Sequence, residues 1–349
     1  MMKTFILKTI FFVTPFLGIL VFVNYFGDAA RLFANDYEQK MAKIIGSGKY
    51  VTNFGNYDER LCQLELIKLK SISPKTIIIG SSRTMLFNSS HFPGTTFFNN
   101  SVSGASMEDI VSIYQIYKEY KKVPKKIIIG IDPWTFNDLS DQNRWKSIAT
   151  YYNRFIQLES QEGYELMKYK ELFSFSYFQS SLKLMPKFLK GDLDPTPTSN
   201  SHNISATKLT DGALVYDQLF RQSSVKEIDN RIHEYISKDL YSIENFKVFS
   251  KRSWITFNKL IKELEKNHVE IEFIFSPFPP LVYEVIESKY PLVLSTEVKV
   301  NEFAKLHKIL VLGTFNPNKL GMDNSYFYDG MHCKEDALKK IIESKNKNK

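Results

Sequence analysis

Cysteine and histidine are scarce in this chain. The 349 residues include two cysteines, Cys62 and Cys333, which are too few for a zinc cluster or a disulfide framework but enough for one bridge. The six histidines are scattered, and His233-Glu234 has no second histidine at the spacing of a metal-binding helix. The sequence therefore predicts no catalytic metal and no cofactor.

Two widespread motifs are also missing. No Gly-x-Ser-x-Gly segment occurs, which disfavours the nucleophile elbow of an α/β-hydrolase. Residues 46–49, Gly-Ser-Gly-Lys, lack the first glycine of a phosphate-binding loop and the strand that precedes one. The composition, 43% hydrophobic and 24% charged, is typical of a globular chain and excludes a disordered or collagen-like protein.

Residues 9–26 form an apolar run without charge. As a helix, a run of this length spans about 27 Å, close to the hydrocarbon thickness of a bilayer. Lys3 and Lys8 precede the run, and acidic residues outnumber basic ones directly after it. By the positive-inside rule, we expect a cytoplasmic N-terminus over 1–8, one transmembrane anchor over 9–27 and an extracytoplasmic remainder at the cell membrane.

A cleaved signal peptide is the alternative interpretation of this run, with Gly27, Ala29 and Ala30 as a small-residue cleavage site. The run is longer than a typical signal core, which favours the uncleaved anchor. Export also changes the meaning of the net charge of +8. An exported basic chain does not meet the genome, so we expect no nucleic-acid partner and interpret the lysine-rich tail from residue 334 as a solvated helix end.

Five short apolar runs alternate with segments of helical period in the rest of the chain. The runs are 76–80, 95–99, 126–131, 269–275 and 309–312. This alternation predicts the α/β class, with a parallel sheet covered on both faces. We expect a helical stalk over 28–74 and one sheet domain over 75–345. A helical insertion of about 138–245 interrupts that domain, and residues 191–211 are expected to be a mobile loop or a disordered linker.

The first strand runs directly into Gly80-Ser81-Ser82-Arg83. A hydroxyl at this point lies at the carboxyl edge of a parallel sheet, where ligands bind. The amides at the start of the following helix are aimed at the same spot and suit an oxyanion. A plain turn with a helix cap is the structural alternative.

Two further segments follow strands. After the last strand, Asp329 stands three residues before His332, a spacing that lets the carboxylate fix the imidazole tautomer while the other ring nitrogen serves as a base. After the second strand, residues 99–104 are Asn-rich and end in Gly104, whose backbone N–H can approach a tetrahedral intermediate closely. The structural alternative for this loop is a helix entry with Ser106 as the cap and Asp109 as its partner.

The three segments, in this order, resemble the blocks of the SGNH or GDSL hydrolase superfamily: Gly-Asp-Ser, an Asn-rich block ending in Gly, Gly-x-Asn-Asp and a terminal Asp-x-x-His. The resemblance implies a flavodoxin-like three-layer α/β/α fold. It implies that Ser82 is the nucleophile, with His332 as its base and Asp329 as the orienting carboxylate. Gly104 and Asn99 become the oxyanion or substrate-binding candidates.

The third block departs from this pattern. Asp132 stands where the family usually has an oxyanion Asn, and an ionised carboxylate cannot donate a hydrogen bond. Arg83 is the second oddity: it could pair with Asp132, grip an anionic substrate, or form an ordinary surface ion pair. An anchor combined with an eroded third block is similar to the exported branch of the family, which includes the D-alanyl-transfer protein of lipoteichoic acid assembly and the alginate O-acetyltransferases.

The sequence thus predicts a membrane-anchored, extracytoplasmic serine esterase or O-acyltransferase of a cell-envelope polysaccharide. Its expected partners are an acylated glycan or acyl donor, the membrane, and a membrane-bound O-acyltransferase. The rival hypothesis is a non-catalytic glycan-binding or assembly protein that keeps the same fold. Asp132 is the residue that favours this rival.

Overall fold

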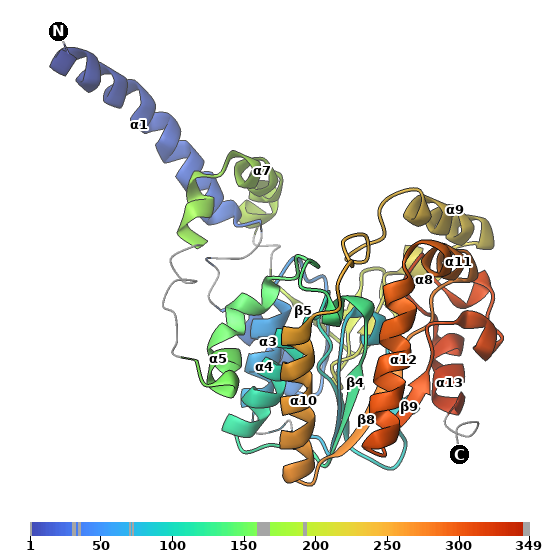
Figure 1. The fold of residues 1–349 in the computed structure, drawn as a ribbon. Helices are drawn as coiled ribbons and strands as arrows, with labels where there is room; N and C mark the ends of the chain where they lie inside the picture. Colours follow the sequence, from blue (N-terminus) through green and yellow to red (C-terminus); the bar gives the residue numbers. More distant parts are fainter. Residues whose placement is uncertain are drawn as a thin grey trace.

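A computed structural model describes residues 2–29, 33, 36–69, 71, 73–158, 168–190 and 194–344. All five expected strands are present and form one parallel sheet in the order β3-β2-β4-β8-β9 (Figure 1). Their bounds are Thr76–Ile79 (β2), Phe97–Asn99 (β3), Lys126–Gly130 (β4), Glu270–Phe275 (β8) and Leu310–Gly313 (β9). The prediction of an α/β fold with a parallel sheet is therefore confirmed.

The helices cover both faces of this sheet. Their bounds are Met2–Gly27 (α1), Tyr37–Gly46 (α2), Glu59–Lys68 (α3), Met107–Glu119 (α4), Ala149–Ile156 (α5), Phe175–Lys190 (α7), Gln218–Arg221 (α8), Val225–Ile236 (α9), Lys251–Lys266 (α10), Pro280–Lys289 (α11), Pro291–Leu306 (α12) and Glu335–Glu343 (α13). Alternate strand residues point to opposite faces. Accordingly, Ile77 and Ile127 pack with residues of α4, α10 and α12, whereas Ile78 and Ile128 pack with residues of α13.

A second, smaller sheet was not expected from the sequence. It is antiparallel, in the order β5-β1-β6-β7, with bounds Tyr50–Thr52 (β1), Thr196–Thr198 (β5), Thr207–Lys208 (β6) and Leu214–Val215 (β7). The insertion is therefore not purely helical. The expectation of a disordered linker over 191–211 is wrong where β5 and β6 pair with β1, and the alternative of a mobile loop stays a prediction; residues 191–193 lie outside the described part.

The insertion docks on the main sheet next to β2 and β3. The backbone N–H of Leu214 donates to the Met85 carbonyl at 2.9 Å, and that of Asn99 donates to the Asp211 carbonyl at 2.7 Å. Both contacts lie at the carboxyl ends of the strands. Residues that are more than a hundred positions apart in the sequence are thereby brought to the same edge.

The segment expected as a helical stalk is part of the domain. Its helices α2 and α3 bury Met41, Ile45 and Ile67 in the core shared with α4. The apolar faces of two short helices would be exposed on a stalk, and burying them here removes that surface from water. Cys62 of α3 and Cys333 are both buried and free, so they form no bridge.

Helix α1, Met2–Gly27, begins earlier than the expected anchor and leaves the sheet domain at one end (Figure 1). Among the described residues, it is the one helix long and apolar enough to cross a membrane, and only 6% of its most apolar stretch is buried. Ala30, one of the residues of the expected cleavage site, lies outside the described residues. The orientation of the chain in a membrane stays a prediction.

Arg60 of α3 provides a test of this packing. Its guanidinium is buried, bonds Asp109 at 2.8 and 3.0 Å, and donates to the Ser103 carbonyl at 2.8 Å. Arg60→Ala leaves the Asp109 charge buried and unpaired, so we expect the free energy of unfolding to fall by about 3–5 kcal/mol. Urea unfolding of the full chain in detergent, followed by tryptophan fluorescence, measures this change.

Lys118→Ala is the matched control, because it breaks the exposed ion pair with Glu263. We expect this variant to lose at most about 1 kcal/mol. Equal losses in Arg60→Ala and Lys118→Ala would contradict a buried, tightly packed position for α3.

Candidate active site

Ser82 lies at the carboxyl edge of the parallel sheet, as the first residue of a short 3-10 helix, Ser82–Thr84. Strand β2 ends at Ile79, and the Ser81 side chain caps the short helix by accepting the Arg83 N–H at 3.1 Å. Ser81 is buried, whereas Ser82 is half-buried and reaches solvent. Of the two adjacent serines, Ser82 is thus the one with an accessible hydroxyl.

The structure brings Ser82, His332 and Asp329 into one chain of hydrogen bonds. His332 Nε2 lies 2.9 Å from Ser82 Oγ, and His332 Nδ1 lies 2.8 Å from Asp329 Oδ2. An ionised carboxylate only accepts hydrogen bonds, so Nδ1 carries the ring proton. Nε2 is then left to accept the Ser82 hydroxyl proton, which is the arrangement of a nucleophile, a base and an orienting acid.

Asp329 is held in its ionised form by its surroundings. Burial works against the charge, but the His332 imidazole and three hydrogen bonds outweigh it and lower the pKa of the carboxyl. Two of these bonds come from the backbone: Asp329 Oδ1 accepts the N–H of Met331 at 2.7 Å and that of His332 at 2.9 Å. The local turn therefore positions the carboxylate and the imidazole together.

Gly104 lies in the loop between β3 and α4 with a positive φ of 56°, a conformation that favours glycine. A Cβ at this position would collide with Gln142 and Tyr241 of the insertion. The neighbouring Ser103 is fixed by Glu59, which accepts its N–H and, at 2.8 Å, its hydroxyl. The loop is thus held from two sides, and the oxyanion role of Gly104 stays a prediction.

Asn99 is used inside the fold rather than at an open site. Its side chain is fully buried, and its Nδ2 donates to the carbonyls of Thr84 and Phe87, each at 2.8 Å. Its Oδ1 accepts the Ser101 N–H at 2.9 Å. Since the amide is committed on both sides, Asn99 is not available to a substrate, which corrects the expectation that it binds one.

Arg83 and Asp132 form a buried ion pair, with Nη1 3.0 Å from Oδ1 and both side chains at most 4% exposed. The surface ion pair and the grip on an anionic substrate are therefore both wrong for Arg83. Burial raises the pKa of Asp132, while the Arg83 charge and a hydrogen bond from Ser81 oppose that rise. Asp132 accepts from Arg83 and is no substitute for the amide donor of an oxyanion Asn.

The remaining Arg83 donors reach two other loops. Nη2 donates to the carbonyls of Ser276 and Pro277, the latter at 2.9 Å, and Nε donates to the Met331 carbonyl at 3.3 Å. The Phe278 ring stacks on the guanidinium at 3.8 Å. One side chain next to Ser82 thus contacts the loop that ends in His332.

Sequence reasoning missed an aromatic group beside the imidazole. Tyr216, which follows β7 in the insertion, lies edge-on to His332 with ring centres 5.9 Å apart. Tyr328 contacts Tyr216 at 5.3 Å and stacks on Phe220 at 5.4 Å. Burial, followed by the Asp329 charge, raises the pKa of Tyr216, so its phenol stays neutral. The docking of the insertion brings Tyr216 and Phe220 to the site, and no local sequence signal identifies them, whereas Tyr328 directly precedes Asp329 in the chain.

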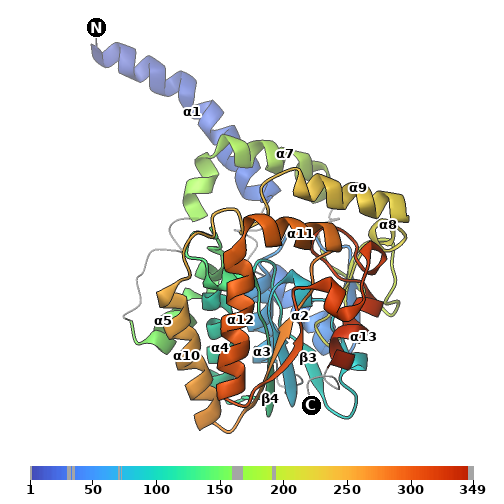
Figure 2. The same ribbon diagram turned by 45° about the vertical axis from the view of Figure 1, so that its right-hand side comes forward.

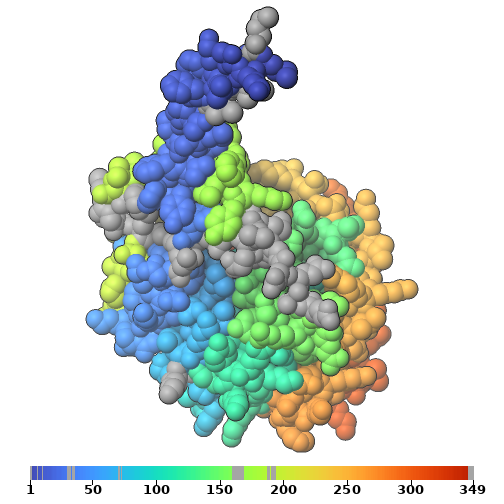
Figure 3. Space-filling model, turned by 90° about the vertical axis from the view of Figure 1, so that its left-hand side faces the viewer, coloured from blue at the N-terminus to red at the C-terminus, as the bar shows by residue number. Residues whose placement is uncertain are grey.

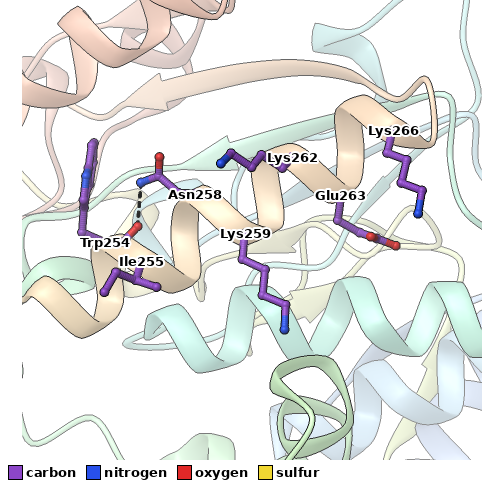
Figure 4. A pocket seen from close by; sticks show the side chains of 7 residues that line it. All are labelled: Trp254, Ile255, Asn258, Lys259, Lys262, Glu263 and Lys266. Atoms are coloured by element: carbon purple, nitrogen blue, oxygen red, sulfur yellow. Dashed lines mark hydrogen bonds between the residues drawn. The ribbon is translucent and has the colours of Figure 1, made fainter.

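A hollow on the surface of α10 is a different kind of feature (Figure 4). Its seven lining residues all belong to this one helix; Lys262 and Lys266 are exposed, and Lys259 donates to the Phe155 carbonyl of α5 at 2.9 Å. It contains no nucleophile or base–acid pair. The hollow is the exposed face of a helix, so the candidate active site remains at the carboxyl edge.

Among the described residues, no three His, Cys, Asp or Glu side chains are arranged to hold a metal ion. No family model and no curated protein matches the chain.

The lowered pKa of Asp329 predicts a pH-dependent loss of stability in Asp329→Asn. The carboxylate stabilises the fold while it is ionised, so its contribution is complete above the unfolded pKa of about 3.9 and is lost as the pH falls through the lower folded value. Asparagine can still accept the two backbone bonds. We expect the variant to be less stable than the parent at about pH 6 and the difference to shrink at about pH 3.

Urea unfolding at both pH values measures this difference. Asp336→Asn, which alters an exposed pair with Lys339, is the control and should change stability by at most about 1 kcal/mol. A difference for Asp329→Asn that grows as the pH falls would contradict the sign of the shift.

Proposed function

We propose that this protein is a membrane-anchored, extracytoplasmic serine esterase or O-acyltransferase of the SGNH type, acting on a cell-envelope polysaccharide. The observation that carries the proposal is the continuous hydrogen-bonded chain from Ser82 through His332 to Asp329. The order of the site segments and the parallel sheet support the same superfamily and its flavodoxin-like arrangement.

The proposed reaction has two halves. Ser82 Oγ attacks the carbonyl carbon of an acyl donor while His332 Nε2 takes the hydroxyl proton, and Asp329 stabilises the resulting imidazolium. The tetrahedral intermediate collapses, its leaving group takes the proton from His332, and an acyl-Ser82 ester remains. A sugar hydroxyl or water, deprotonated by His332, then attacks this ester, which restores Ser82 and yields a new ester or an acid.

The oxyanion in both halves is assigned to backbone amides. The N–H groups of Ser82 and Gly104 are the proposed donors, and Asp132 contributes none because it accepts from Arg83. Backbone donors on fixed loops need little reorganisation during the reaction, which suits this task.

Sugar hydroxyls are the proposed acyl acceptors. The edge-on Tyr216 and the stacked Phe220–Tyr328 pair beside His332 offer aromatic surface of the kind that packs against sugar rings. Acetyl or a similar small acyl group is the group proposed to be transferred. A membrane-bound O-acyltransferase is the proposed partner that would deliver it across the membrane.

The anchor is proposed to be retained rather than cleaved. Asn24, within the last turn of α1, is fully buried and donates to the carbonyls of Glu171, Leu172 and Ser174 at 2.9–3.1 Å. Cleavage near Gly27 would remove this buried side chain and its three hydrogen bonds to the insertion. The contact therefore supports an uncleaved anchor.

A non-catalytic glycan-binding or assembly protein is the second candidate. One observation favours it: the buried Arg83–Asp132 pair occupies the place of a third oxyanion donor. The two candidates differ in whether Ser82 reacts.

Ser82→Ala is expected to abolish labelling by a fluorophosphonate probe and to lower p-nitrophenyl acetate turnover by about 10³-fold or more, because the nucleophile is lost. Both are measured on the full chain in detergent. Ser90→Ala, which changes an exposed serine nearby, is the matched control and should keep parental labelling and turnover.

Undiminished labelling of Ser82→Ala would refute the assignment of the nucleophile. Polysaccharide binding that survives Ser82→Ala, together with no turnover by the parent, would instead support the non-catalytic candidate.

A further inference from the structure

The insertion carries an amphipathic helix that lies beside α1. Helix α7, Phe175–Lys190, and the 3-10 helix before it, η5 (Lys168–Phe173), pack against α1. Figures 1 and 3 both show α7 next to the C-terminal end of α1, where α1 leaves the sheet domain. This pairing joins the part of the chain expected to cross the membrane to a segment about 150 residues later.

The contact between the two helices is specific. The Asn24 amide donates to the carbonyls of Glu171, Leu172 and Ser174, where η5 ends and α7 begins. Tyr177 of α7 donates to Asp28 Oδ1 at 2.6 Å, and the Ser181 backbone passes so close to Gly27 that a Cβ there would collide with it. The position of α7 along α1 is therefore fixed.

The outer surface of this pair is strongly apolar. Large side chains that are between 38% and 76% exposed gather on both helices and on η5: Phe22, Tyr25, Phe26, Tyr169, Phe173, Phe175, Leu182 and Leu189. Isolated exposed apolar residues are ordinary, but a group of this size marks an interaction surface. Because Phe22, Tyr25 and Phe26 belong to α1, the proposed membrane span, the partner of this group is expected at the same membrane.

The charges of α7 indicate what that partner is. The helix contains three lysines, at positions 183, 187 and 190, and no acidic residue. Aromatic and leucine side chains combined with lysines are typical of helices that lie in the headgroup layer of an anionic bilayer. Exposed tyrosine and phenylalanine at the end of a span also match the interfacial aromatic belt.

We propose that η5 and α7 form a second membrane contact, lying in the anionic lipid headgroup layer of the bilayer that α1 crosses. This contact goes beyond the proposed function and shares with it only the span of α1. In Figures 1 and 2, α1 and α7 lie toward the end of the domain where α11 begins, directly after the carboxyl end of β8. With this contact, the carboxyl edge of the parallel sheet, which carries Ser82, lies on the side of the domain that faces the lipid.

The test places a fluorophore on this surface. Phe175→Cys and Leu189→Cys, each at an exposed position, are labelled with a nitrobenzoxadiazole probe in the full chain. Leu306→Cys is the matched control, because Leu306 is 82% exposed at the end of α12 near the opposite edge of the sheet. The parental chain, whose two cysteines are buried, controls for labelling elsewhere.

Each labelled chain is placed singly in nanodiscs of phosphatidylglycerol, with and without lipids that carry a nitroxide on the headgroup. We expect the nitroxide to lower the fluorescence at Phe175→Cys and Leu189→Cys by about two-fold or more and to leave Leu306→Cys unchanged. Equal responses at all three positions would overturn the proposal. So would a response at Phe175→Cys that requires a second copy of the chain in the nanodisc, because protein would then cover the surface.

This readout does not depend on turnover. Loss of esterase activity would therefore leave the membrane contact standing, and absence of quenching would leave the assignment of Ser82 standing.

Discussion

The buried guanidinium of Arg83 is the interaction on which the candidate site depends. It follows Ser82 directly, and it bonds Asp132 after β4, Ser276 and Pro277 after β8, and Met331 before His332. The carboxyl ends of three parallel strands and the last loop are thereby tied to one charged group. A charge in this position is stable only with all its partners in place, because an unpaired buried ion costs several kcal/mol. The distance between Ser82 and His332 is therefore a consequence of core packing.

Arg60 is a second buried arginine, and it ties together the segments on the other side of the candidate site. Arg60 joins α3 to Asp109 at the start of α4 and to the Ser103 carbonyl, one residue before Gly104. The segment before β2 therefore supports the loop that is proposed to hold an oxyanion. This explains why α2 and α3 belong to the domain: if they moved as a stalk, the loop with Gly104 would lose the two bonds from Glu59 as well.

The sequence was sufficient for the main sheet and for the residues that meet at its edge. Each of the five strands is a nearly continuous apolar run, and such runs have few alternatives to a buried parallel sheet. Ser82, Asp329 and His332 could be paired in advance because each follows a strand, and the carboxyl ends of parallel strands share one edge. The small sheet could not be anticipated in this way. Its strands are two or three residues long, and β1 pairs with segments about 150 residues away, so no local period identifies them.

The incorrect predictions for Asn99 and Arg83 have the same physical cause. Asn99 and Arg83 are polar residues near the candidate nucleophile Ser82, and sequence position alone assigns such residues to the substrate. In the structure both are buried, and their side chains donate to backbone carbonyls in the loops that follow the strands. Tyr216 is the converse case: it lies in a segment without a motif, and the docking of the insertion brings it to His332. Polar residues near Ser82 thus hold the candidate site together, while an aromatic segment distant in the sequence lies beside His332.

An aspartate rather than an asparagine at position 132 follows from the same constraint. An Asn amide at this position would leave the buried Arg83 without a counter-charge, so the arginine and the aspartate have to occur together. The pair removes one side-chain donor from the proposed oxyanion site, and in exchange it fixes the loops that carry Ser82 and His332. Backbone amides are then the donors that remain, and their positions are set by the same loops. Arg83 thus makes the strand ends rigid, and this rigidity sets the positions of the proposed backbone donors.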